Sequence, residues 1–119
     1  HDRLARATRA GATALGLRLL APAAPSPAAT AVFVPDGVDG AALVRYLRDR
    51  MHVTFAGGQD QLKGKIVRLS HLGYVGTFDV ITGLAALELA LAHLGASVTF
   101  GRGVGAAEAV LAEGLPARA

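Results

Sequence analysis

The chain has 119 residues, of which 52% are hydrophobic and 18% are charged, and it contains no cysteine and no tryptophan. This length holds one ordinary hydrophobic core, so a complete two-lobed cofactor enzyme is not expected. The lack of cysteine excludes disulfides, thiolate metal sites and cysteine nucleophiles within these residues.

The positive charge raises the question of nucleic-acid binding, since the formal net charge is +3 and the isoelectric point is near 10.0. The lysines and arginines are spread along the chain and only 5% of residues are aromatic. Nucleic-acid binding relies on clustered cations and stacking aromatics, so we expect no nucleic-acid partner.

The longest apolar stretch, residues 78–94, is interrupted by Asp79, Glu88 and His93, so we expect no membrane span. No signal peptide opens the sequence, and we expect a cytoplasmic protein.

The first residues have helical spacing. Apolar or small residues recur every three or four positions from Leu4 to Leu19, which predicts a leading helix within residues 1–20. A proline-rich segment then ends the helix, because proline lacks an N–H and restricts the residue before it. The periodic pattern is under way at the first residues without a strong cap, which predicts that the chain is cut from something longer.

Residues 30–95 are predicted to form an α+β core. Strands are expected at residues 30–34, 52–56 and 65–70. Asp39 is a suitable N-cap for a helix running to about Arg50. A long apolar helix follows, with Thr77 as its expected cap and Gly95 at its end.

Residues 96–119 are predicted to be a C-terminal extension with a short strand at 97–100 and a helix at 106–113. The order of elements predicts a single α+β domain over residues 1–119. Its small, mainly antiparallel sheet of three to four strands is expected to be covered by helices.

Most groups with chemical potential have a structural interpretation. The glycine-rich run from Gly101 to Ala106 lacks the βαβ context and the downstream acidic residue of a dinucleotide site, so we interpret it as a loop. The four histidines share no metal-ligand spacing, and we expect no metal site. Ser70 and His71 are adjacent and so cannot face each other as nucleophile and base. Lys63 and Lys65 flank a turn, whereas a carbonyl-reactive lysine needs a desolvated pocket.

Arg68 is the strongest candidate for a binding residue, because it is the one cation within the apolar segment 66–69. Alternate residues of a strand point to opposite faces, so Arg68 lies on the face opposite its two apolar neighbours. A guanidinium in such a place commonly binds a carboxylate through two parallel hydrogen bonds. Beside a residue that binds a carboxylate ligand, two structural alternatives stay open. One is an internal salt bridge to Asp60 or Asp79, and the other is a surface arginine whose stem lies on apolar surface and whose charge stays in water.

The block around Arg68 resembles a known family. Residues 62–75 read LKGKIVRLSHLGYV. This run is similar to the block near the carboxyl end of class V pyridoxal-phosphate aminotransferases, Gly-Lys, two apolar residues, Arg, an apolar residue and Gly-His-Met-Gly. The alanine–glyoxylate and serine–pyruvate types are the closest. Ser70 stands where the block commonly has Gly, and Leu72 where it commonly has Met. The resemblance extends over residues 1–95, with further pieces at residues 9–11, 15–17, 26–27, 35–39, 56–59, 78–80 and 84–88.

The resemblance implies the C-terminal small domain of a fold-type-I pyridoxal-phosphate transferase. Such an enzyme transfers an amino group between an amino acid and a 2-oxo acid such as glyoxylate or pyruvate. In that family the arginine of the block binds the substrate carboxylate, which implies this role for Arg68. The catalytic and cofactor-binding residues belong to a large domain that would precede His1. The resemblance therefore implies no catalytic or cofactor-binding residue here, pyridoxal phosphate in the parent enzyme only, and a homodimeric parent.

A second hypothesis is a non-catalytic α+β module for ligand binding or oligomerisation. The coding sequence upstream of His1 separates the two hypotheses. A long upstream domain with a lysine at the end of a strand supports the enzyme, and a start codon or an unrelated domain supports the module.

Overall fold

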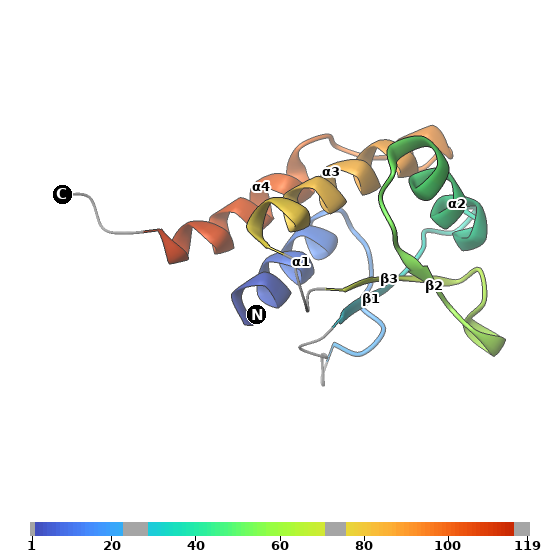
Figure 1. Cartoon of the computed structure of the whole chain (residues 1–119). Coiled ribbons are helices and arrows are strands. Elements are labelled where there is room, and N and C mark those ends of the chain that lie inside the picture. Colours follow the sequence, from blue (N-terminus) through green and yellow to red (C-terminus); the bar gives the residue numbers. More distant parts are fainter. Residues whose placement is uncertain (1, 23–28, 71–75, 116–119) are drawn as a thin grey trace.

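The structure is a computed structural model that describes residues 2–22, 29–70 and 76–115 (Figure 1). In chain order its elements are helix α1 (Asp2–Ala14), strand β1 (Ala29–Phe33), helix α2 (Gly40–Met51), strand β2 (Ala56–Gly57), the 3-10 turn η1 (Asp60–Leu62), strand β3 (Ile66–Ser70), helix α3 (Thr77–His93), helix α4 (Arg102–Leu111) and the 3-10 turn η2 (Ala112–Gly114).

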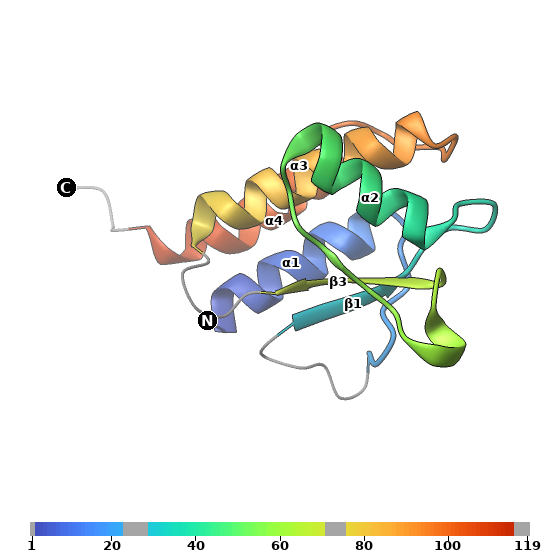
Figure 2. The ribbon, with the colours of Figure 1, turned by 45° about the vertical axis from the view of Figure 1, so that its right-hand side comes forward.

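The sheet has three antiparallel strands in the order β1-β3-β2, so β3 is central. A short extended segment follows the outer edge of β1, where the Leu20 N–H donates to Ala31 O and the Phe33 N–H donates to Arg18 O, both at 2.9 Å. The helices lie on one side of the sheet (Figures 1 and 2). This arrangement confirms the predicted α+β class with a small antiparallel sheet.

The main core lies between the covered face of the sheet and the helices α2 and α3. Val32 of β1 lies opposite Val67 of β3, and both side chains are buried. The helices supply the apolar side chains above them, chiefly Leu43, Leu47, Leu87 and Leu91. Burial of these apolar side chains holds β3 against the helices and so determines which side of the strand stays open.

A second core joins α1, α3 and α4, and it contains Ala7, Val80, Leu84, Ala107 and Leu111. Helix α4 lies in the segment predicted as the C-terminal extension of the domain, and its Ala107 and Leu111 belong to this second core. Two of the three buried residues of α4 are Gly103 and Ala107, which are small enough to let helices approach closely. Such residues add little to an apolar periodicity, so the pattern of the sequence does not reveal this packing.

Three boundaries differ from the sequence-based predictions. The leading helix ends at Ala14 instead of continuing to residue 20, because Gly16 adopts a φ of +84° that stops the helix. Of the strand predicted at residues 52–56, β2 keeps only its last residue, Ala56. His52 instead forms the left-handed cap of α2, with a φ of 57°.

The ends of the later helices also depart from expectation. The cap of α3 is Gly76, whose N–H donates to Asp79 Oδ2 at 2.8 Å, and not Thr77. The segment 97–100 forms no strand, and α4 begins at Arg102 instead of residue 106. The prediction that Asp39 caps α2 is confirmed, since its Oδ1 accepts from the Ala41 N–H at 3.1 Å.

Gly11 is expected to tolerate no side chain, because α1 passes very close to α3 and α4 there. A Cβ at this position would lie 2.5 Å from Leu84 Cδ1 and 2.9 Å from the Gly103 carbonyl oxygen. Gly11→Ala should lower the free energy of unfolding by about 1–3 kcal/mol in a urea titration. Gly105 on α4 is the control, because a Cβ there meets nothing within 4 Å. Gly105→Ala should raise stability by up to about 1 kcal/mol, and equal effects of the two variants would contradict the predicted clash.

Candidate functional site

Arg68 lies in the middle of β3, on the face of the sheet that the helices leave open. Its neighbour Val67 is 1% exposed against the core, whereas Arg68 itself is exposed. The cross-strand partners of Arg68 are Ala31 on β1 and Ala56 on β2. Directly opposed residues of a sheet share a face, so the arginine lies between two methyl side chains. Neither cross-strand partner therefore has a side chain long enough to cover the guanidinium.

The structure does not pair Arg68 with the internal carboxylates that the sequence left open. Among the described residues, no ion pair joins Arg68 to Asp60 or Asp79. Asp79 is instead engaged at the start of α3, where it accepts from the Gly76 N–H. An arginine on an open face without an internal anion is able to bind an external one.

A second arginine lies on the same face of the sheet, at the edge beside β1. The guanidinium carbon of Arg18 is 4.2 Å from the centre of the Phe33 ring, a cation–π contact. Phe33 lies opposite Ile66 in the register of β1 with β3, one alternate position along from Arg68. The open face therefore combines a stacked arginine at its edge with Arg68 at its centre, which has no ion pair within the described part of the chain.

Lys65 lines a surface hollow of about 370 Å³ together with Arg18 and Phe33, but neither Lys63 nor Lys65 is buried. Both are exposed and they lie on either side of Gly64, in the turn that leads into β3. A lysine that forms a Schiff base needs a desolvated environment that lowers its pKa. Neither lysine therefore lies in an environment that favours a Schiff base.

The glycine-rich run at the start of α4 holds an internal carboxylate. Glu88 of α3 is 4% exposed, and it accepts hydrogen bonds from the backbone N–H groups of Gly101 at 2.6 Å, Gly103 at 3.0 Å and Val104 at 3.1 Å. A helix N-terminus favours negative charge, and the side chain of Glu88 takes the place that a phosphate would need. The sequence analysis did not predict this role of Glu88. The available signal was a carboxylate in the middle of a long, mainly apolar helix.

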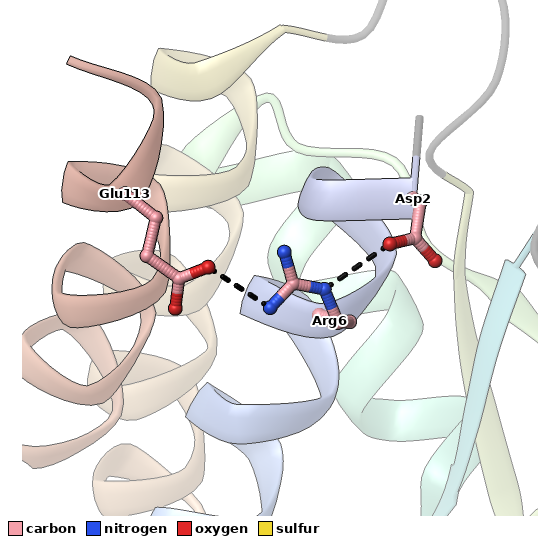
Figure 3. Close-up of polar contacts among 3 residues, drawn as sticks. All are labelled: Asp2, Arg6 and Glu113. Atoms are coloured by element: carbon pink, nitrogen blue, oxygen red, sulfur yellow. Dashed lines mark hydrogen bonds and ion pairs between the residues drawn. The ribbon is translucent and has the colours of Figure 1, made fainter. Parts of the chain in front are cut away.

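Arg6 of α1 bridges two carboxylates at the surface (Figure 3). It donates from Nε to Asp2 at 3.2 Å and from Nη1 to Glu113 of η2 at 3.1 Å. The hydrogen bonds to Glu113 and to Asp2 raise the pKa of Arg6 above its usual value. Elsewhere, the hydrogen bond from Arg48 lowers the pKa of Asp49. These exposed pairs lie outside the open face and fix local geometry only.

Two of the four histidines, His52 and His93, lie within the described residues. His93 stacks on Tyr46 with ring centres 4.3 Å apart. Of the predicted Ser70–His71 pair, His71 falls outside the described residues. Within residues 2–22, 29–70 and 76–115, no three histidine or carboxylate side chains are grouped as metal ligands. The described helices are all too short or too polar to cross a lipid bilayer.

Comparison with known proteins gives several relatives, although no family model matches the chain. The chain is 47% identical over 113 residues to the small subunit of a soluble hydrogenase from Synechococcus sp., which covers 93% of the chain and 29% of that protein. It is 34% identical over 121 residues to serine–glyoxylate aminotransferase from Methylorubrum extorquens, at 100% of the chain and 30% of the relative.

The fold is similar to that of a solved aminotransferase. The crystal structure of pyridoxamine–pyruvate aminotransferase from Mesorhizobium loti superposes with a TM-score of 0.89 and 38% identity, over 95% of this chain and 30% of that one. The chain thus spans about 30% of the length of its relatives. In sequence and in fold, it matches the C-terminal part of the class V aminotransferases.

Proposed function

We propose that this chain is the C-terminal small domain of a pyridoxal-phosphate-dependent aminotransferase. The parent enzyme transfers an amino group between an amino acid and a 2-oxo acid such as glyoxylate or pyruvate. The observation that carries the proposal is Arg68, which lies on the open face of the central strand and forms no ion pair with any carboxylate of residues 2–22, 29–70 and 76–115. Relatives named for glyoxylate and pyruvate transamination support the substrate class.

Arg68 is the proposed binding residue for the substrate carboxylate. The amino acid and the 2-oxo acid both carry a carboxylate next to the reacting carbon. One arginine with a rigid fork of donors can hold both molecules in the same register, which positions the reacting carbon. Ala31 and Ala56 leave the approach to the guanidinium open from either side. When bound in the parent enzyme, pyridoxal phosphate supplies the electron sink for the chemistry.

The proposal assigns the cofactor and the catalytic groups to a large domain that precedes this chain in a cytoplasmic, homodimeric parent enzyme. The test is direct. The coding sequence upstream of His1 should encode a domain with a lysine at the end of a strand, and the full-length protein should transaminate glyoxylate or pyruvate. A start codon or an unrelated domain immediately upstream would support the non-catalytic α+β module instead.

The 119-residue chain by itself is expected to be inactive and free of cofactor. Its two lysines in the described residues are exposed, whereas a lysine that forms a stable Schiff base needs a desolvated pocket. Purified chain mixed with pyridoxal phosphate and desalted should show no absorbance band of bound cofactor and no transaminase activity. The full-length protein is the positive control, and a retained band in the short chain would contradict this assignment.

Two relatives carry the name of a soluble hydrogenase subunit, which would suggest redox chemistry for the parent protein. Iron–sulfur clusters are held mainly by cysteine thiolates, and these 119 residues contain no cysteine. The matched part therefore supplies no thiolate for such a cluster, whereas Arg68 is a residue type that aminotransferase chemistry uses.

A further inference from the structure

An apolar groove lies at the end of the domain where three helices meet. Its volume is about 380 Å³, and its wall combines the first turns of α3, the end of α4 with η2, and the start of α1. The apolar part of the wall is formed by Phe78, Ile81, Leu111 and Leu115. The groove is separate from the open face of the sheet that carries Arg68.

The groove carries the two most exposed large apolar side chains among the described residues. Phe78 is 79% exposed and Leu115 is 71% exposed, and both side chains line this groove. Single exposed apolar residues are common on protein surfaces, but apolar side chains gathered around one hollow mark a surface that another segment covers.

The start of α1 forms the rim of this groove. Arg3 lines it, and the Arg3 guanidinium lies so close to Gly114 of η2 that a Cβ there would be 2.6 Å from Nη1. In two views the end of α4 reaches beyond the first turn of α1 (Figures 1 and 2). The N-terminal end of α1 therefore lies at the groove that Phe78 and Leu115 line.

The relatives supply such a chain. They are about three times as long as this sequence, which matches their C-terminal part. A second copy of the chain fits the groove less well. Nine residues line it, whereas each side of a stable protein interface has about 20–30 residues. A covalently attached segment needs less contact area, because its effective concentration at the groove is high.

We propose that the groove is an internal docking site, covered in the parent protein by residues that precede His1. The inference rests on the proposed function, since it needs the longer parent chain. In that arrangement Phe78 and Leu115 become buried contacts between this domain and the upstream part. The contacts hold the domain, and with it Arg68, in one orientation relative to the rest of the enzyme.

The test uses thiol labelling in the full-length protein. The chain has no cysteine, so Phe78→Cys and Leu115→Cys each place one thiol in this part of the sequence. Phe100→Cys is the matched control, because Phe100 is 62% exposed and lies next to the opposite end of α4. Maleimide labelling at each position is followed by mass spectrometry of the peptide that contains it.

If labelling depended only on the exposure of each residue within this domain, position 78 would be labelled at least as fast as position 100. If upstream residues cover the groove, positions 78 and 115 should be labelled more slowly than position 100, by roughly tenfold or more. Labelling at the control rate at both positions would overturn the inference. Protection that disappears when the protein is diluted would also overturn it, because such protection would come from a second copy of the protein. Transaminase activity measured on the same samples separates the two proposals: an active enzyme with an unprotected groove removes only the docking site.

Discussion

Arg68→Ala in the full-length protein is expected to lower kcat/KM for every amino-acid donor by about 30-fold to 900-fold, a loss of about 2–4 kcal/mol of transition-state binding. Removal of the guanidinium takes away the charged, two-point contact that holds the substrate carboxylate. No other cation replaces it at this position, since its cross-strand neighbours are Ala31 and Ala56. Steady-state kinetics with several donors, and with the 2-oxo acid varied separately, measure the effect on both half-reactions.

Two further variants make the result specific. Arg68→Lys keeps the charge but loses the planar fork, so kcat/KM should fall by an intermediate factor. Arg48→Ala removes an exposed arginine that pairs with Asp49 on α2, away from the open face, and should leave kcat/KM unchanged. Unchanged activity of Arg68→Ala toward all donors would remove the assignment of this residue.

Glu88→Ala is expected to lower the free energy of unfolding by about 2–4 kcal/mol, because it leaves several backbone N–H groups at the start of α4 without their acceptor. Glu88 is buried, and its carboxylate accepts from Gly101, Gly103 and Val104. The variant also removes the negative charge that the N-terminus of α4 favours. Urea unfolding followed by circular dichroism measures the change.

The controls for this variant come from the same helices. Glu88→Gln keeps one carbonyl acceptor but turns an amide NH2 toward the donors, so it should destabilise less than alanine does. Glu108→Ala removes an exposed carboxylate from α4 and should change stability by less than about 0.5 kcal/mol. If Glu88→Ala were no more destabilising than Glu108→Ala, the carboxylate would not be holding α4 in place.

Local chemistry predicted the elements whose signals lie within a few residues. Asp39 stands two residues before the N–H that it accepts from, so the start of α2 followed from the sequence. The segments that became β1 and β3 were also expected within one residue of their observed ends. Boundaries that depend on distant partners were missed. The start of α4 was placed at residue 106 instead of Arg102, because the cap comes from Glu88, thirteen or more residues earlier in the chain.

The candidate site divides in the same way. The alternation of a strand placed Arg68 opposite its apolar neighbours, and the structure has Val67 buried and Arg68 exposed. Its two alanine neighbours could not be predicted, because they come from strands whose pairing depends on the whole sheet. Only the tertiary structure shows that Arg68 forms no ion pair with Asp60 or Asp79.

The sequence by itself determined the α+β class, the long apolar helix and the face on which Arg68 lies, because period, composition and local caps are properties of neighbouring residues. Only the tertiary structure decided that α4 belongs to the core, that Glu88 caps it, and that Phe78 and Leu115 line one groove. These features join residues far apart in the chain. Their contacts depend on how close the helices approach, which the small residues Gly11 and Gly103 permit without leaving an apolar pattern in the sequence.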